Sequence, residues 1–294
     1  MRKALHTLWR ALTAPLRLIA WPFRAVREFL NYEPEETSTA DVFSRAFEEP
    51  AVLLEHLEAL RRHLFRAVLV LAVTTAGSFL FAPRILDYLA RPIGGIQALQ
   101  AIEVTESIGA FMRVSLLTGF ALALPYIAFE AFAFMNPGLK RSERTLVLFA
   151  VPMAFLLFVA GLAFTYFIVL PAALDFLLSF MGIPTIPRPS NYIRFVTNLM
   201  LWIGLAFEFP LVIYVLAGLG FVRARTLVRG WRFAIVGIAV LAAAATPTVD
   251  PVNMALVMGP MIVLYFFSIL LAALAQAGRR RREQPPEPDG AMAA

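Results

Sequence analysis

Two acidic residues lie within stretches of the sequence that are otherwise apolar. Glu208 lies in LWIGLAFEFPLVIY and Glu130 lies in ALPYIAFEAFAF. If these stretches cross a membrane, each charged side chain costs at least ~2.5–3.5 kcal/mol on insertion scales and needs a partner, water or a function. Pro210 removes a backbone donor just after Glu208, which predicts a polar cavity or a kinked helix. We expect a functional role for Glu208, whereas hydrogen bonding to neighbouring helices or snorkelling explains Glu130.

Other chemistry is poorly supported by the residue types. His56 and His63 are seven residues apart and share a helix face, but no HExxH pattern or third ligand accompanies them, so we expect surface histidines. Cysteine is absent, which excludes Cys-ligated metal sites and thiol nucleophiles. The sequence contains no GxGxxG, P-loop or GxSxG pattern. We therefore predict that the chain is not an enzyme and holds no cofactor or metal.

The composition is that of an integral membrane protein. Of the 294 residues, 60% are hydrophobic and 16% charged, whereas soluble domains have roughly 45–50% and about 25%. Stretches of the length that spans a bilayer predict an all-α fold of about six transmembrane helices. They cover residues 64–82, 108–129, 146–170, 193–216, 233–245 and 252–275.

Two features of these spans carry further expectations. The fifth stretch is too short to cross alone, so it must borrow Trp231 and Arg232, thin the bilayer or pack against other helices. Glycines within or beside the spans are expected at close contacts between helices; these are Gly119, Gly161, Gly204, Gly218 and Gly237.

The basic residues predict the orientation of the chain. The net charge is +6, and most Arg and Lys residues flank apolar stretches, which indicates membrane topology and no nucleic-acid partner. They cluster before the first span, between the second and third, between the fourth and fifth, and after the sixth. The only basic residues in the loops on the opposite side, 83–107 and 171–192, are Arg84, Arg91 and Arg188. Because the number of spans is even, both termini lie on the same side, and the basic residues place that side in the cytoplasm. We therefore predict a protein of the cytoplasmic (inner) membrane with both termini in the cytoplasm.

Three regions follow from this topology. Residues 1–50 form a cytoplasmic extension, either a kinked basic helix on the membrane surface or a disordered tail, and not a signal peptide, because arginines interrupt any apolar core. Residues 51–277 form the six-span domain. Residues 278–294 are a basic segment followed by a disordered cytoplasmic tail.

Five motifs across residues 51–271 occur in an order typical of one family. They are EHLEALRRHL (55–64), FMNPGLKRSER (134–144), GLAFTYFIVLP (161–171), FEFP (207–210) and TPTVDP (246–251). Together they resemble the TatC family of twin-arginine protein translocases. This resemblance implies a concave, glove-like bundle that recognises twin-arginine signal peptides. It also implies an oligomeric complex with single-span TatA and TatB subunits, driven by the proton-motive force to export folded proteins.

The resemblance also implies which residues act. Paired arginines require cytoplasmic carboxylates, because a guanidinium pairs best with a carboxylate in a two-pronged geometry. The residues expected to bind the signal peptide are Glu55, Glu58, Arg61, Phe134, Pro137, Glu143 and Arg144. Glu208 matches the intramembrane glutamate of the family, where we expect partner docking, and Pro92, Pro125 and Asp250 match structural positions.

The sequence departs from the family pattern at a few positions. Where the family has an acid directly before Leu-Arg, this chain has Ala59, and Glu55 is the acid one helical turn earlier. The Gln and Trp that often precede the Phe of the second motif are replaced by Glu130 and Phe132, and Phe266 replaces a glutamate of the last span.

A second function class stays open at this point. A proton-coupled small-solute transporter could also use an acid such as Glu208, although the sequence has no convincing internal repeat. A membrane-embedded hydrolase would need a nucleophile and base within the spans, where Cys and His are missing.

Overall fold

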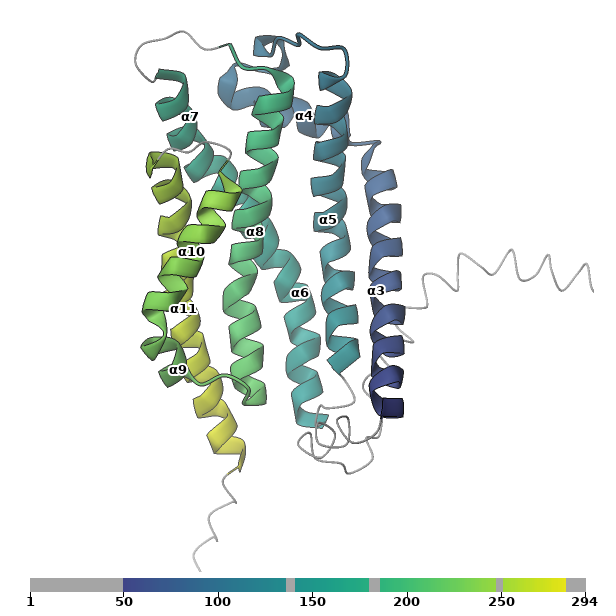
Figure 1. Cartoon of the computed structure of the whole chain (residues 1–294), viewed down its shortest axis with the longest axis vertical. Coiled ribbons are helices and arrows are strands. Elements are labelled where there is room, and N and C mark those ends of the chain that lie inside the picture. The colour runs from purple at the N-terminus through teal and green to yellow at the C-terminus, as the bar shows by residue number, and fades with distance from the viewer. Residues whose placement is uncertain (1–49, 136–140, 180–185, 247–250, 284–294) are drawn as a thin grey trace, which may run out of the picture. The chain divides into compact units, whose positions relative to one another are not determined.

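The computed structural model describes residues 50–135, 141–179, 186–246 and 251–283, and every regular element in these ranges is helical. The main helices are α3 (Pro50–Ser78), α4 (Ala82–Ala90), α5 (Glu106–Met135), α6 (Arg141–Phe164), α7 (Leu170–Ser179), α8 (Pro189–Leu219), α9 (Ala224–Arg229), α10 (Trp231–Ala245) and α11 (Pro251–Glu283) (Figure 1). Short 3-10 turns, η1 (Arg91–Ile93) and η2 (Ile96–Ala98), follow α4, and a π-helical turn, η4 (Thr165–Val169), joins α6 to α7. Helices are expected here because a backbone in hydrocarbon must satisfy its own polar groups.

The lengths of these helices confirm an all-helical membrane protein. Among the described residues, four helical segments are long and apolar enough to cross a membrane: Glu106–Met135, Leu146–Leu178, Pro189–Leu219 and Pro251–Gly278. A fifth candidate is the pair His56–Ser78 and Ala82–Ile93, which is bent by 74°. The remaining predicted stretch is α10, of 15 residues, which includes Trp231 and Arg232 as expected. Five predicted stretches therefore lie on continuous helical segments, the first stretch (64–82) is interrupted by the turn after Ser78, and the number that cross the membrane stays a prediction.

The third predicted span is longer than the sequence suggested. Its helix continues past Pro171 to Ser179, so α7 occupies part of the segment expected to be an exterior loop. In η4 the Leu170 N–H donates to the Thr165 carbonyl, five residues earlier. Such a wide turn accommodates a residue that has no backbone donor, which explains why Pro171 does not end the helix.

Contacts between Cα atoms divide the chain into two compact units. Of the described residues, the first contains 50–65, 129–135 and 141–148, and the second contains 66–128, 149–179, 186–246 and 251–283. The predictions for residues 1–49 lie outside the described residues, as do Asp250 and residues 284–294 of the tail.

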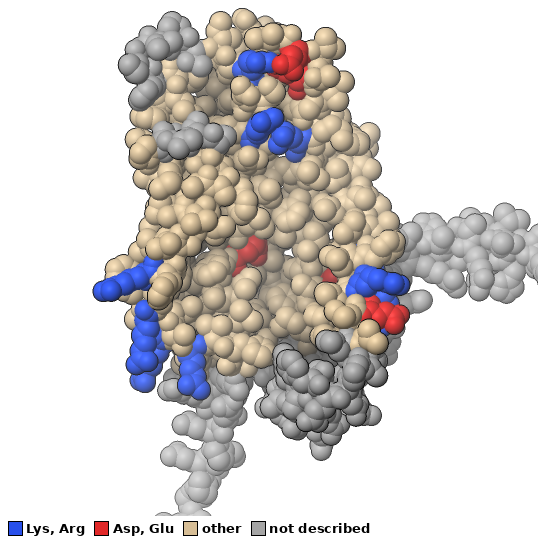
Figure 2. Space-filling model, in the orientation of Figure 1, with Lys and Arg blue, Asp and Glu red and all other residues tan. Residues whose placement is uncertain are grey.

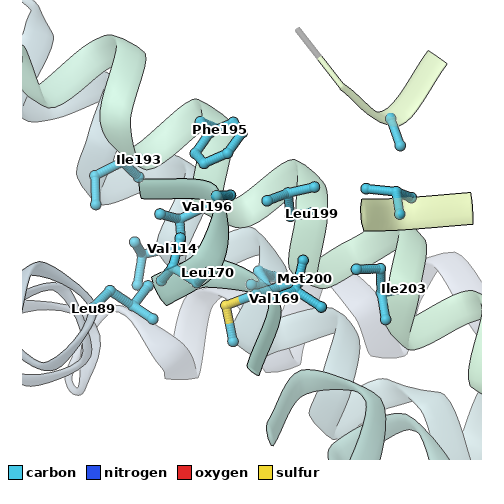
Figure 3. Close-up of a cluster of buried hydrophobic side chains, with 14 of the residues drawn as sticks. Leu89, Val114, Val169, Leu170, Ile193, Phe195, Val196, Leu199, Met200 and Ile203 are labelled. Carbon is cyan, nitrogen blue, oxygen red and sulfur yellow. The ribbon is translucent and has the colours of Figure 1, made fainter. Parts of the chain in front are cut away.

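Helix α8 forms the core of the second unit (Figure 3). In its most apolar window 44% of the residues are buried, compared with 22–28% for the other long candidate spans. Its buried side chains recur at three- and four-residue spacing and pack against side chains of α4, α5 and α7; they include Ile193, Val196, Met200 and Ile203. Between membrane helices such packing stabilises mainly through van der Waals contact and not through removal of water.

Glycines allow two close helix contacts in this unit. A Cβ atom at Gly119 would lie 2.5 Å from the Thr75 Cα atom, and one at Gly161 would lie 2.8 Å from the Gly204 Cα atom. The Ser78 hydroxyl donates to the Ser115 carbonyl at 2.6 Å across the first of these contacts. The expectation is wrong for Gly237, because a Cβ atom there would meet nothing within 4 Å.

Charged side chains of the second unit gather near the two ends of α8. Arg188 precedes the helix, and Arg223, Arg225 and Arg229 follow it. A helix of 31 residues is about 46 Å long, which exceeds the ~30 Å hydrocarbon core. Figure 2 shows charged side chains over α4 and over α9, with a wide belt of mostly uncharged side chains between them. This is the distribution expected of a membrane-spanning unit.

Candidate functional site

All the residues expected to bind a signal peptide belong to the first compact unit. They come from the N-terminal part of α3, the last turns of α5, and the start of α6. Residues 51–65 and 129–135 are well separated in the chain but meet within this unit. Pro137 lies outside the described residues.

On α3 the candidate residues lie on a continuous helix. This helix begins at Pro50, so Glu55 and Ala59 are one turn apart in regular structure. The side chains of Glu58 and Arg61 are exposed, and Ala59 is half-buried. The side chain of Glu55 is outside the described set.

Phe134 connects the end of α5 to this part of α3. Its ring centroid lies 4.6 Å from that of His56 and 6.1 Å from that of His63. His56 lies between Glu55 and Glu58 in the sequence, so the aromatic ring packs beside the turn that carries both acids.

A buried acid and a histidine form the main polar contact between these helices. Glu130 is buried, and its Oε2 atom lies 2.5 Å from Nδ1 of the half-buried His63. Of the two explanations offered for Glu130, hydrogen bonding to a neighbouring helix and snorkelling, this contact agrees with the first. His56 is exposed, as expected of a surface histidine, and His63 is half-buried. No motif pairs residues 67 positions apart, so this contact could not be predicted from the sequence.

The first turn of α6 carries Glu143 and Arg144. Arg144 is fully buried. The helix bounds place Glu143 in the first turn, where the exposed N–H groups of a helix favour a negative charge, although its side chain is outside the described set.

Glu208 lies in the second unit, on α8. The helix continues through Pro210, and Glu208 is one turn after Gly204, against which the ring of Phe158 packs. The acid is half-buried, and its Oε1 atom is buried without a hydrogen-bond partner in the described part of the chain. It therefore lies on the face of α8 that meets α6.

An apolar cavity lies beside α8; neither Glu208 nor Pro210 lines it, so the polar cavity or kinked helix expected from Pro210 stays a prediction. Its volume is about 320 Å³ and it lies between α8, α10 and α11. Its walls include Trp202, Phe209, Gly237 and Tyr265. Gly237 thus lines open space and does not form a helix contact.

At the other end of α8, one arginine joins the start of α5 to the residues just before α8. Nε of Arg188 donates to Oε1 of Glu106 at 2.9 Å, Nη2 donates to the same oxygen, and Nη2 lies 3.2 Å from Oε1 of Glu103. The Gln100 N–H also donates to the Pro187 carbonyl at 3.2 Å. Hydrogen bonding to Glu106 raises the pKa of the Arg188 guanidinium above its ordinary value, so the cation is retained. From the sequence, Arg188 is expected only to influence membrane topology, and its contacts with Glu103 and Glu106 are additional.

The two family prolines that the structure describes lie in different surroundings. Pro92 lies in η1, and Pro125 lies inside α5.

Comparisons with known proteins agree with the motif pattern. The sequence model of the family described as "Sec-independent protein translocase protein (TatC)" matches residues 55–260. A protein of that name from Carboxydothermus hydrogenoformans is 34% identical over 228 residues, which cover 76% of this chain and 94% of that protein. Another from Deinococcus radiodurans is 34% identical over 248 residues, which cover 81% of this chain and 92% of that protein.

A solved structure extends the similarity to the fold. The crystal structure of a twin-arginine translocase receptor, TatC, superposes with a TM-score of 0.67 at 33% identity, covering 75% of this chain and 99% of that one. None of these similarities supports the solute-transporter alternative. With its five motifs in register, the family match and the shared fold, the chain belongs to the TatC family of Sec-independent protein translocase proteins.

Proposed function

We propose that this protein is the receptor core of a twin-arginine translocase, which binds twin-arginine signal peptides and assembles with single-span TatA and TatB subunits. The observation that carries the proposal is the family match over residues 55–260, together with the similar structure named as a twin-arginine translocase receptor. Export of folded proteins would then use the proton-motive force, and the chain itself would perform no covalent catalysis.

The first compact unit supplies the chemistry for arginine recognition. Exposed Glu58, with Glu55 one turn before Ala59 and Glu143 on α6, gives this unit the carboxylates that paired guanidinium groups require. Phe134 offers an apolar contact beside the α3 turn. Arg144 is fully buried, so we assign it to positioning α6 and not to direct contact with the peptide.

Glu208 serves a different step in this proposal. Glu208 is only half-buried and its hydrogen-bonding capacity is incompletely used among the described residues, so a partner helix could bind its carboxyl group within the membrane. We therefore assign Glu208 to the docking of a single-span subunit.

The position in the cell follows from the charges. The family's role and the apolar helices make this a membrane component of a protein translocase. We infer an inner-membrane location with both termini in the cytoplasm and assembly into an oligomeric complex.

The test is co-purification with a precursor. The full chain should retain a precursor with paired arginines and release its paired-lysine version, because lysine cannot pair with a carboxylate through two parallel hydrogen bonds. Equal retention of the two precursors would contradict the proposal.

A substitution at Glu143 tests the site within that function. A hydrogen bond to a charged group contributes ~1.5–3 kcal/mol, so Glu143→Ala should lower precursor affinity by roughly tenfold or more. Ser142→Ala is the control on the same turn and should bind as the wild type does. If Glu143→Ala and the wild type bind both precursors alike, the assignment of Glu143 is wrong while the family role stands.

A further inference from the structure

A basic groove lies where α9 meets α10 in the second unit. Its volume is about 570 Å³, and it is lined by Val228, Arg229, Trp231, Arg232, Phe233 and Val236. Gly230 is the single residue between the two helices, so Arg229 ends one helix and Arg232 lies in the first turn of the other.

The charge of this groove is unbalanced within the chain. Residues 219–245 contain four arginines and no acidic residue. No ion pair joins Arg229 or Arg232 to another described residue, and the Arg232 guanidinium lies 5.7 Å from the centroid of the Trp231 ring. Figure 2 shows basic side chains over α9 with no described acidic side chain among them on this face. The groove therefore favours an anionic ligand.

An apolar stripe begins at the same groove. Along α10, Phe233, Val236 and Val240 are 84%, 62% and 64% exposed. Their spacing of three and four residues places them on one face of the helix. A ligand that fits both features has an anionic head and a long apolar chain.

The length of α10 sets the depth of the two arginines. Its 15 residues extend about 22 Å, less than the ~30 Å hydrocarbon core. The bilayer must thin around such a helix, which brings lipid headgroups towards Arg229 and Arg232. Tryptophan prefers the same interfacial level, and Trp231 lies between the two arginines.

We propose that Arg229 and Arg232 bind the phosphate of an anionic phospholipid, whose acyl chain lies along Phe233, Val236 and Val240. Guanidinium groups bind phosphate oxygens through paired hydrogen bonds, so this pair holds the head in place. Arg223 and Arg225 lie in the same segment but do not line the groove, which separates the site from the general attraction of basic residues to the inner leaflet.

Quenching of Trp231 fluorescence tests the proposal. The full chain, with Trp9, Trp21 and Trp202 replaced by Phe, is purified and placed in lipid nanodiscs of fixed phosphatidylglycerol and phosphatidylcholine content. In parallel samples one lipid or the other carries brominated acyl chains at the same mole fraction. Brominated phosphatidylglycerol should quench Trp231 several-fold more strongly than brominated phosphatidylcholine. Equal quenching by the two lipids would overturn the proposal, and this comparison needs no substitution of either arginine.

Matched variants identify the residues that cause the preference of the Trp231 region for phosphatidylglycerol over phosphatidylcholine. Arg229→Gln with Arg232→Gln should abolish it, whereas Arg223→Gln with Arg225→Gln removes the same charge and should preserve it. If the double Gln variant does not fold, Arg229→Lys with Arg232→Lys replaces it in the test. This Lys variant keeps the charge and should retain part of the preference. Equal losses in the two Gln pairs would assign the effect to general surface charge and overturn the site. The same holds if the preference appears only after a partner protein is added.

Discussion

The Glu208 carboxyl group has one oxygen that is buried without a hydrogen-bond partner in the described part of the chain. A buried polar atom without a partner costs about 1–3 kcal/mol, and more when the group is charged. The other acid in an apolar stretch, Glu130, is compensated by His63. Both acids contact a second helix of the chain, Glu130 through His63 and Glu208 through the backbone of Phe158, but Glu208 keeps one oxygen without a partner among the described residues.

This difference predicts different responses to the same substitution. Glu208→Gln removes the charge but keeps hydrogen-bonding capacity, so membrane levels should be normal while export or partner docking falls several-fold. Glu130→Gln is the matched control, because the amide oxygen can still accept from His63, and export should stay near the wild-type rate. Export of a twin-arginine reporter and co-purification of partner subunits measure both. Wild-type export with an unchanged complex in Glu208→Gln would make Glu208 a packing residue.

Ala59 is the residue where the family pattern and this sequence disagree, and the continuous helix α3 makes the consequence calculable. Successive helix residues are about 100° apart, so Glu58 points away from the Ala59 direction. Glu55 projects within about 40° of Ala59 and ~5–6 Å nearer the helix start. Glu55→Gln should therefore weaken precursor binding more than Glu58→Gln, and adding Ala59→Glu should restore much of it.

Precursor binding or crosslinking is compared among the wild type, Glu55→Gln, Glu58→Gln and the double variant Glu55→Gln with Ala59→Glu. If Glu58→Gln is the more damaging change and Ala59→Glu gives no rescue, the displaced charge does not come from Glu55.

At the scale of helices, close packing can be tested one methyl group at a time. Gly119→Ala places a Cβ atom against the Thr75 backbone, so α3 and α5 must separate, and overpacking of this kind costs about 1–3 kcal/mol. Gly237→Ala adds the same group within α10 but faces open space, so its stability should be unchanged or slightly higher. Unfolding of the purified protein in detergent compares the two. Equal destabilisation by both would show that helix contacts do not explain the effect.

The helices themselves were predictable because length and hydropathy are local properties of the sequence. Five of the six apolar stretches lie on continuous helical segments, the first spans the break between α3 and α4, and α10 begins at Trp231, two residues before its predicted stretch. The continuation through Pro171 was not predictable, because it depends on the π-helical turn η4. Neither were the His63–Glu130 and Arg188–Glu106 contacts, since their partners are 67 and 82 residues apart and no local pattern relates them.

The candidate site was predicted by motif order and not by geometry. In the sequence, Glu208 is recognisable as an ionisable residue within an apolar, membrane-spanning stretch. The structure adds that one of its oxygens has no hydrogen-bond partner among the described residues. The contact of Phe134 with His56 depends on the folding of two distant segments into one unit, which hydropathy does not report.

At the scale of the whole molecule, the predicted number of crossings depends on α10, the shortest of the predicted spans. The other apolar stretches lie on helices of crossing length or on the bent pair of α3 and α4. An even number of crossings places both termini on one side, whereas a re-entrant α10 would place the C-terminus outside the cell. The second outcome would export the basic run at residues 279–282, against the positive-inside rule.

Topology reporters distinguish these outcomes. A fluorescent protein fused after Ala294 should fluoresce, because it folds in the cytoplasm when α10 crosses. Alkaline phosphatase fused after Gln100 should be active, because this residue lies in the first exterior loop, and the same enzyme fused after Arg229 should be inactive. A dark fusion at Ala294, with the other two reporters as expected, would show that α10 enters and leaves on one side. In that case the thinned bilayer around α10 would also be absent, and the depth argument for Arg229 and Arg232 would lose its basis.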